Sequence, residues 1–201
     1  MSIKAVLFDL GKVLLRFDFD PAFRRLSRHC ERTPDQIRAF FGRSELEVLY
    51  DGGKISSYDF YRRVSGELGL SVDYTGFRNI WNAIFTPVPG MARLVSRLSA
   101  KKRLVLISNT NAMHYAHVKK HYPVLGKFHR HVLSFEEKVR KPDPRIYRQA
   151  QKACRAKPEE IFYVDDREDL TAAAREFGFL VHTFREDLPK LNERLERLHI
   201  L

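Results

Sequence analysis

No apolar run in this sequence of 201 residues approaches the roughly 20 residues that a membrane span requires. The apolar segment near the N-terminus is interrupted by Asp9 before it reaches the length of a signal-peptide core. Only two cysteines are present; Cys30 and Cys154 are far apart and fit no metal-ligand spacing, which gives no support to a disulfide framework or a zinc site. We therefore expect a soluble, cytoplasmic protein without a membrane partner.

Acidic residues are fewer than basic ones: 25 aspartates and glutamates stand against 36 lysines and arginines, for a formal net charge of +11. Such a charge attracts either a phosphorylated substrate or nucleic acid. The basic residues are distributed over many predicted helices, without a basic stripe interleaved with aromatic residues and without a nucleic-acid motif. The sequence thus favours a small phosphorylated metabolite over nucleic acid as the partner, and it leaves the oligomeric state open.

Polar residues follow directly after three apolar segments that predict buried strands. The segments and the residues behind them are 5–8 with Asp9 and Gly11, 103–107 with Ser108 and Asn109, and 161–164 with the acidic cluster 165–169. Ligands of open α/β sheets bind outside the carboxyl ends of the strands. A basic turn around Lys141 adds a cation, so these groups are predicted to converge on one phosphate and one metal ion.

Predicted helices and strands alternate from Met91 to the end of the chain. The helices begin at Met91 and span 112–120, 144–154, 169–177 and 186–199, and the strands span 103–107, 131–134, 161–164 and 180–183. This alternation predicts an α/β fold with a doubly wound parallel sheet and helices on both faces.

The stretch between the first strand and residue 103 is too long for a simple crossover, and it predicts four or five amphipathic helices. Three helix starts are indicated by capping pairs, namely Thr33 with Gln36, Ser44 with Glu47, and Ser56 with Asp59. Linkers are predicted near residues 15–21 and at the proline-containing segment 86–90. We expect a core domain of residues 1–15 and 88–201, and an inserted helical cap domain of residues 16–87.

The order and spacing of these segments resembles the haloacid dehalogenase-like (HAD-like) hydrolase superfamily, whose members are mostly phosphatases with an aspartate nucleophile and magnesium. The stretch 8–13, together with Ser108-Asn109-Thr110-Asn111, is similar to a subgroup that contains bacterial sugar-1-phosphate phosphatases and has a DxG first motif. The resemblance implies a HAD-like Rossmannoid core, a helical cap over the active site, and a small phosphomonoester such as a sugar phosphate as the substrate.

The same resemblance implies roles for individual residues. Asp9 would be the nucleophile that forms an aspartyl-phosphate, and Lys141 would neutralise the phosphate together with Asp9. Ser108 and Asn109 would bind phosphate oxygens. Magnesium (Mg²⁺) would be held by the Asp9 carboxylate, the backbone carbonyl of Gly11 and the Asp166 carboxylate, with Asp165 or Asp169 beside it.

Two positions depart from the pattern of the resembling family. Its phosphatases usually carry a second, acid–base aspartate where this chain has Gly11, and often an Asp or Asn where it has Leu170. Without that aspartate we expect turnover to depend on the leaving group, unless Asp18 or Asp20 supplies the proton. The alternatives are a non-catalytic phosphate-binding or interaction protein, and a haloacid dehalogenase, against which the acidic cluster argues.

Three histidines, His114, His117 and His121, fall on one face of a predicted helix. Their spacing suits a transition-metal site, but no cysteine lies near them in the sequence. We expect an exposed basic helix there rather than a metal site.

Overall fold

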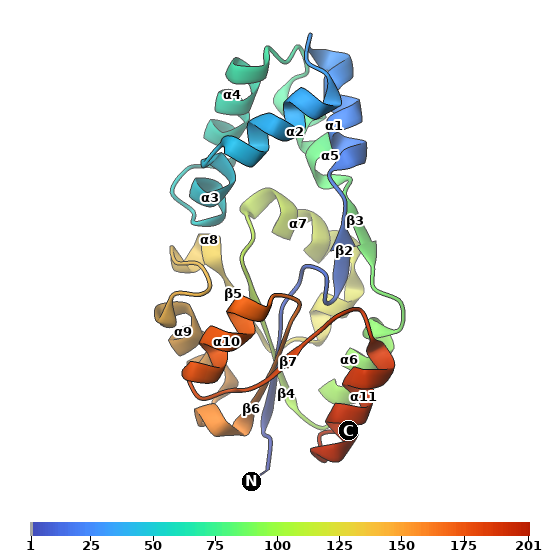
Figure 1. Ribbon diagram of the computed structural model, residues 1–201, viewed down its shortest axis with the longest axis vertical. Helices are drawn as coiled ribbons and strands as arrows, with labels where there is room; N and C mark the ends of the chain where they lie inside the picture. Colours follow the sequence, from blue (N-terminus) through green and yellow to red (C-terminus); the bar gives the residue numbers. More distant parts are fainter. Residues whose placement is uncertain (1) are drawn as a thin grey trace.

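Five parallel strands form the central sheet of the computed structural model, which describes residues 2–201. The strands run in the order β5-β4-β1-β6-β7, so the first strand of the chain lies at the centre (Figure 1). Their bounds are Ala5–Phe8 for β1, Arg103–Ser108 for β4, Arg130–Leu133 for β5, Ile161–Asp165 for β6 and Leu180–Thr183 for β7. The predicted doubly wound α/β fold is confirmed, and the strands were located to within one residue at each end.

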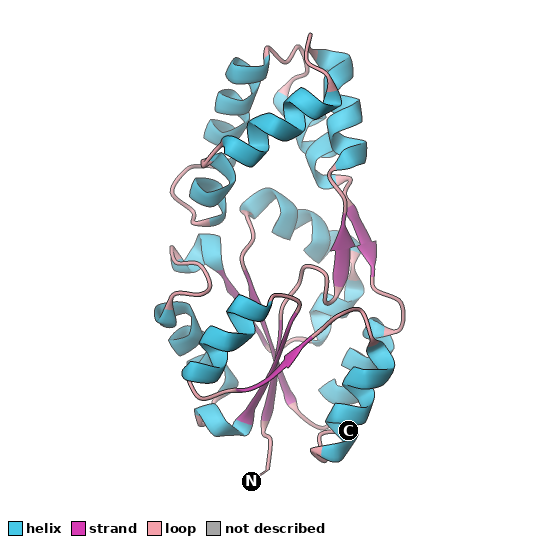
Figure 2. Cartoon of the chain, in the orientation of Figure 1, coloured by secondary structure: helices cyan, strands magenta, loops and turns pink. Residues whose placement is uncertain are grey.

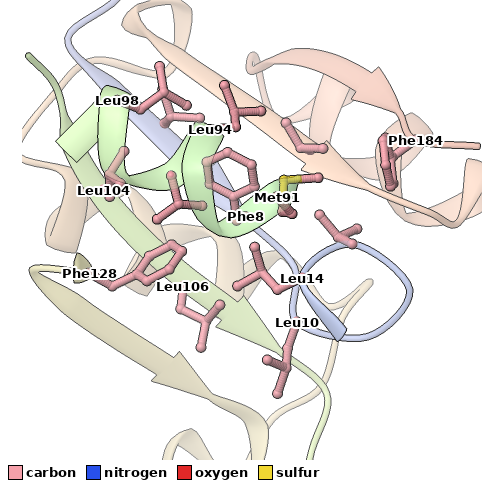
Figure 3. Close-up of a cluster of buried hydrophobic side chains, with 14 of the residues drawn as sticks. Phe8, Leu10, Leu14, Met91, Leu94, Leu98, Leu104, Leu106, Phe128 and Phe184 are labelled. Atoms are coloured by element: carbon pink, nitrogen blue, oxygen red, sulfur yellow. The ribbon is translucent and has the colours of Figure 1, made fainter. Parts of the chain in front are cut away.

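Alternate side chains of each strand feed two separate hydrophobic cores, one on each face of the sheet. Val6 and Phe8 belong to one core, whereas Ala5 and Leu7 belong to the other. Figure 3 shows Phe8 in the first core, surrounded by side chains such as Leu94 and Leu106. The helices that contribute to this core are α6 (Met91–Ser99), α7 (Ala112–His121), η2 (Pro123–Lys127) and α11 (Leu188–Arg197), and those on the other face are α9 (Pro144–Cys154) and α10 (Glu168–Glu176).

The helical insertion has a hydrophobic core of its own, rich in aromatic rings. Its elements are α1 (Asp20–Leu26), η1 (Ser27–His29), α2 (Pro34–Arg43), α3 (Leu46–Asp51), α4 (Ser57–Leu68) and α5 (Tyr74–Asn82), which form the upper lobe in Figure 2. Thr33 and Gln36 form the predicted capping box of α2, and Ser56 caps α4. Helical boundaries with strong capping residues were therefore predictable from the sequence.

The third predicted capping pair is wrong. Helix α3 begins at Leu46, and the Ser44 hydroxyl accepts a hydrogen bond from the Leu46 amide at 3.1 Å instead of capping at the position that pairs with Glu47. Ser and Asp side chains also make such turns outside helices, and here the turn prevailed.

The two predicted linkers are not unstructured. They pair as an antiparallel ribbon of β2 (Leu15–Phe17) and β3 (Phe85–Pro87), which connects the insertion to the core (Figure 1). Pro87 lies opposite Leu15 at the end of this ribbon, where its missing N–H costs no ladder hydrogen bond. Three residues are too few to show an alternating pattern, so the ribbon could not be read from the sequence. The division into domains of residues 1–15 with 88–201 and 16–87 stays a prediction.

A second set of contacts holds the far side of the insertion against the core. The Tyr50 hydroxyl accepts a hydrogen bond from the Met113 amide at 3.0 Å, and Asn111 donates to the Asp51 carboxylate at 3.1 Å. Lys138, which follows helix α8 (Ser134–Glu137), donates to the Gly53 carbonyl at 2.8 Å. The insertion is thus attached at the ribbon and again at the loop after α3.

Gly53, in the loop after α3, lies tightly against Phe135 of the core. Its φ is +61°, and a Cβ built on it would lie 2.1 Å from the Phe135 carbonyl oxygen. Gly69 has a similar φ of +69° at the end of α4, but a Cβ there meets nothing within 4 Å. Comparing Gly53 with Gly69 therefore separates the cost of a left-handed backbone conformation from the cost of a steric clash with Phe135.

We expect Gly69→Ala to lower the free energy of unfolding by about 1 kcal/mol, from backbone conformation alone. Gly53→Ala should cost at least about 1 kcal/mol more, because the added methyl group forces the loop away from Phe135. Chemical denaturation of both variants measures the difference. Equal destabilisation would show that the loop after α3 does not need its close contact with the core.

Candidate active site

A cavity of about 400 Å³ lies between the carboxyl end of the sheet and the helical insertion. It is lined by residues that follow β1, β4 and β6 and by residues of the insertion. Its charged and polar lining consists of Asp9, Lys12, Glu47, Asp51, Ser108, Asn109, Thr110, Asn111, His114, Arg140, Lys141, Asp166 and Arg167. The residues that the sequence placed at one site, namely Asp9, Gly11, Ser108, Asn109, Lys141 and Asp166, all line this one cavity.

Lys141 lies at the centre of the charged groups. Its ammonium nitrogen donates to Asp9 Oδ1 and to Asp165 Oδ2, each at 2.7 Å, and it lies 3.3 Å from the Tyr163 hydroxyl. All three charged residues are buried, with Lys141 only 4% exposed and Asp165 fully covered. Asp165 also accepts hydrogen bonds from Tyr163 and, at 2.9 Å, from the Arg167 amide. A buried lysine between two carboxylates is thereby fully hydrogen-bonded.

The environment raises the pKa values of both Asp9 and Lys141, for different reasons. Burial raises the pKa of Asp9 to about 7, although the positive charge of Lys141 opposes that shift. Burial by itself lowers the pKa of Lys141, but the charges of Asp9 and Asp165 outweigh it and raise that pKa above the ordinary lysine value. The lysine therefore stays charged, and the protein alone does not supply enough positive charge to hold Asp9 fully ionised.

Three carboxylates, Asp9, Asp165 and Asp166, place oxygens within 4.8 Å of one another. Oxygen ligands in this number suit Mg²⁺, which keeps several waters of its own. Asp165 is already occupied by Lys141, Tyr163 and the Arg167 amide, whereas Asp166 has no hydrogen-bond partner among residues 2–201. The backbone hydrogen bonds within the turn after Asp9 are accepted by the carbonyls of Leu10 and Leu15, and none of them is accepted by the Gly11 carbonyl. The donor set fits a magnesium ion held by Asp9, Gly11 and Asp166.

Asp169 does not belong to this cluster. It is exposed and paired with Arg167. Of the two carboxylates that the sequence left open beside Asp166, the structure brings Asp165 into the cluster and keeps Asp169 out.

The side chains of Ser108 and Asn109, at the end of β4, make different contacts. Ser108 is 2% exposed, lines the cavity and has no hydrogen-bond partner for its hydroxyl within the described chain. The Asn109 side chain instead spans to the Lys141 backbone: its amide nitrogen donates to the Lys141 carbonyl at 3.0 Å, and its oxygen accepts from the Lys141 amide at 2.8 Å. Asn109 thus lines the cavity and also holds the Lys141 backbone in place.

Gly11 lies against the ring of Phe17 from the ribbon. A Cβ at Gly11 would come within 2.9 Å of a Phe17 ring carbon and within 3.9 Å of Asp9 Oδ2. A side chain at this position would thus point into the site, but the phenyl ring occupies its space. Asp18 and Asp20 do not line the cavity.

The insertion contributes residues that the sequence did not identify. Glu47 and Asp51 of α3 reach the cavity, together with Arg140 from the core. Burial raises the pKa of Glu47 to about 7, and the nearby charge of Asp51 adds to the shift. The Glu47 carboxylate accepts no hydrogen bond from residues 2–201, and the buried Nε of Arg140 is likewise without a partner there. A pattern of amphipathic helices could not reveal which of their polar residues face the core.

The histidines on α7 lie in different environments. His114 is buried, contrary to expectation, and its ring stacks on Trp81 and contacts Asn111 at 3.1 Å and the Trp81 carbonyl at 3.2 Å. His117 and His121 lie near each other with ring centroids 4.5 Å apart, but no third ligand joins them in the described chain.

The strand order and a cavity lined by charged side chains at the carboxyl end of the sheet define a Rossmann-like α/β fold. The chain matches the model of the haloacid dehalogenase-like hydrolases over residues 3–178 and belongs to that family. Within residues 2–201, none of the helices combines the length and apolar character that a bilayer crossing requires.

Solved structures of similar proteins agree with this assignment. A HAD family enzyme from Bacteroides thetaiotaomicron superposes with a TM-score of 0.86 at 25% identity, over 96% of this chain and 99% of that one. Its wild-type complex with magnesium and inorganic phosphate gives 0.85 at 26% identity, over 94% and 99%. An L-2-haloacid dehalogenase from Xanthobacter autotrophicus, with chloropropionic acid covalently bound, shares the fold at a TM-score of 0.67 and 21% identity, over 100% and 85%.

His114 makes folding sensitive to acid. Burial lowers its pKa to about 4, below the value of about 6.5 for an unfolded histidine. Between these values the unfolded chain takes up a proton that the folded chain excludes, so stability falls as the pH falls. We expect His114→Gln to reduce this pH dependence by up to about 3 kcal/mol between pH 6.5 and pH 4.

Denaturation of wild type and His114→Gln at several pH values checks this expectation. His131 and His182, whose pKa values are also lowered by burial, are common to both proteins and cancel in the comparison. Parallel pH profiles would mean that His114 is protonated in the folded protein.

Proposed function

We propose that this protein is a magnesium-dependent phosphatase that hydrolyses a small phosphomonoester through an aspartyl-phosphate on Asp9. The observation that carries the proposal is the position of Lys141, 2.7 Å from both Asp9 and Asp165, beside the unpartnered carboxylate of Asp166. A phosphoryl group entering the cavity would meet a nucleophile, a fixed positive charge and a cation site together. The magnesium and phosphate in the Bacteroides thetaiotaomicron enzyme support the same chemistry.

Asp9, the Gly11 carbonyl and Asp166 would hold the magnesium ion. When bound, the ion supplies positive charge that lets the anionic Asp9 approach an anionic phosphate. The raised pKa of Asp9 without a cation agrees with this need, since burial raises it and the nearby charge of Asp165 adds to the shift.

Four residues of the protein would carry out the other parts of the reaction: Asp9, Lys141, Ser108 and Asn109. The Asp9 carboxylate would attack phosphorus as the bond to the leaving oxygen breaks, and that oxygen takes a proton from water. A second water would then attack phosphorus of the aspartyl-phosphate, release phosphate and restore the Asp9 carboxylate. Lys141 holds Asp9 through Oδ1 and leaves Oδ2 without a lysine contact. The free hydroxyl of Ser108 is placed to donate to a phosphate oxygen, and Asn109 fixes the Lys141 backbone.

A haloacid dehalogenase is the competing function within the family. Its aspartate attacks carbon and needs no cation, so a carboxylate beyond those that neutralise the lysine would have no use there. Asp166 is such a carboxylate, since Lys141 is paired with Asp9 and Asp165. This favours phosphate chemistry. A non-catalytic role is opposed by the complete and buried arrangement around Lys141, which costs folding energy that a simple scaffold does not require.

The insertion restricts the cavity to a small substrate, and its residues contact the leaving group. Its attachments at the ribbon and at the loop after α3 enclose the cavity from two sides. Glu47, Asp51 and Arg140 face the cavity, which favours a polar leaving group with hydroxyl groups over an apolar one. The sugar-1-phosphate subgroup, with its DxG motif, fits this description.

We expect Asp9→Asn to abolish phosphate release, because an amide is a poor nucleophile and a poor magnesium ligand. Asp169→Asn is the matched control, since Asp169 undergoes the same chemical change outside the cluster and should retain activity. Chelation of divalent cations should stop the wild-type enzyme, and added magnesium should restore it. A phosphate-release assay on folded protein decides, and full activity of Asp9→Asn would contradict the proposed intermediate.

Gly11 predicts a preference for good leaving groups. Without an acid at this position, aryl, acyl and anomeric phosphates should react faster than primary alkyl phosphates. Gly11→Asp alone would meet the Phe17 ring, so it is combined with Phe17→Ala, and Phe17→Ala alone serves as the control. The double variant should gain on alkyl phosphates by up to about 10² to 10⁴.

Turnover on phosphomonoesters graded by leaving-group pKa measures this preference. A flat dependence in the wild type, with the chemical step limiting, would mean that another residue of the cavity delivers the proton. An unchanged slope in the double variant would mean that position 11 has no access to the leaving oxygen.

A further inference from the structure

Carboxylate side chains are absent from one long segment of the sequence. Residues 74–135 contain none of the 25 aspartates and glutamates, yet they contain ten of the 36 lysines and arginines. The segment makes up nearly a third of the chain and runs from α5 through β5. Much of the net charge of +11 therefore comes from one continuous part of the chain.

The fold gathers much of this segment on one side of the core. Helices α6 and α7 both pack against η2, and all three contribute to the same hydrophobic core. Six cations on these elements and on β5 are exposed, and none forms an ion pair within residues 2–201: Arg93, Arg97, Lys119, Lys120, Lys127 and Arg130. Exposed cations without an ion pair, such as Arg24, also occur elsewhere in residues 2–201, but there aspartates and glutamates are interspersed with them along the chain.

An apolar groove of about 330 Å³ lies within this basic side, between α6 and η2. Ala92 and Ser96 of α6 form one wall, Pro123 and Val124 of η2 form the other, and Lys127 lies at the edge. The groove shares no lining residue with the active-site cavity. We call it the α6–η2 groove.

We propose that the α6–η2 groove docks an acidic segment of another protein, which inserts an apolar side chain between the two helices. Charge complementarity identifies the occupant: Lys127 lines the groove, and the further cations on α6, α7 and β5 match several carboxylates spaced along a peptide rather than one anionic head group. The apolar walls supply the anchor, and the unpaired cations supply steering and orientation.

Two other anionic partners fit the groove less well. Single-stranded nucleic acid binds by stacking bases on aromatic rings, and the walls of the groove are mainly aliphatic, with Tyr122 as their one aromatic residue. A membrane surface is bound by apolar groups that protrude, whereas these apolar groups line a recess.

Fluorescence anisotropy tests the proposal with a labelled synthetic peptide in which glutamates flank a central pair of leucines. The full-length protein should bind it, and replacing both leucines by serine should weaken binding by about tenfold or more. Lys127→Glu should weaken binding by about five- to tenfold, and Ser96→Trp should fill the groove and do the same. Arg24→Glu, an exposed and unpaired position on α1 with the same charge change, should have little effect.

Thermal unfolding and phosphate release of these variants should match wild type, because the altered residues lie outside the active-site cavity. No binding of the peptide, equal binding of the serine peptide, or equal losses for Arg24→Glu and Lys127→Glu would overturn the proposal. Tighter, Lys127-dependent binding of an oligouridylate RNA or of phosphatidylglycerol vesicles would assign the groove to a different partner and overturn it as well.

Discussion

The buried ammonium group of Lys141 is the interaction on which the site depends. Removing one lysine and two carboxylates from water is costly, and the arrangement is stable only when every partner is satisfied. The chain provides those partners from distant segments: Asp9 after β1, Asn109 after β4, and Asp165 with Tyr163 on β6. The central strands are therefore held in one register by their buried faces and tied together at their ends by one charge.

This arrangement is negative in sum, and that excess explains why a cation belongs to it. The carboxylates of Asp9, Asp165 and Asp166 lie close together around one buried lysine. Burial raises the pKa of Asp9 to about 7, and the nearby charge of Asp165 adds to this shift. A divalent cation bound there would remove that conflict and keep the Asp9 carboxylate ionised, as the proposed attack on phosphorus requires. Phosphate chemistry and magnesium are thus linked through the same electrostatic requirement.

The sequence was informative wherever local chemistry decided the structure. Buried strands such as Ala5–Phe8 and caps such as Thr33 are fixed by burial and by hydrogen bonds to near neighbours, so they could be predicted. The β2–β3 ribbon joins segments some 70 residues apart by pairing only three residues, and no local pattern records such a pairing. Glu47 likewise could not be distinguished from solvated helix residues, because only tertiary packing turns it toward the cavity.

The distribution of basic residues on the surface also could not be predicted from the sequence. Along the sequence the basic residues look dispersed, and that view favours a solvated surface. Folding changes this, because α6, α7 and η2 bring acid-free segments together while the cavity near Asp9 collects carboxylates. Attraction of a phosphorylated substrate needs positive charge at Lys141, Arg140 and the cation site, and the α6–η2 groove lies apart from all of them. The excess of positive charge on α6, α7 and η2 therefore lies outside the active-site cavity, whose lining has as many acidic as basic residues, and the proposed catalysis does not account for it.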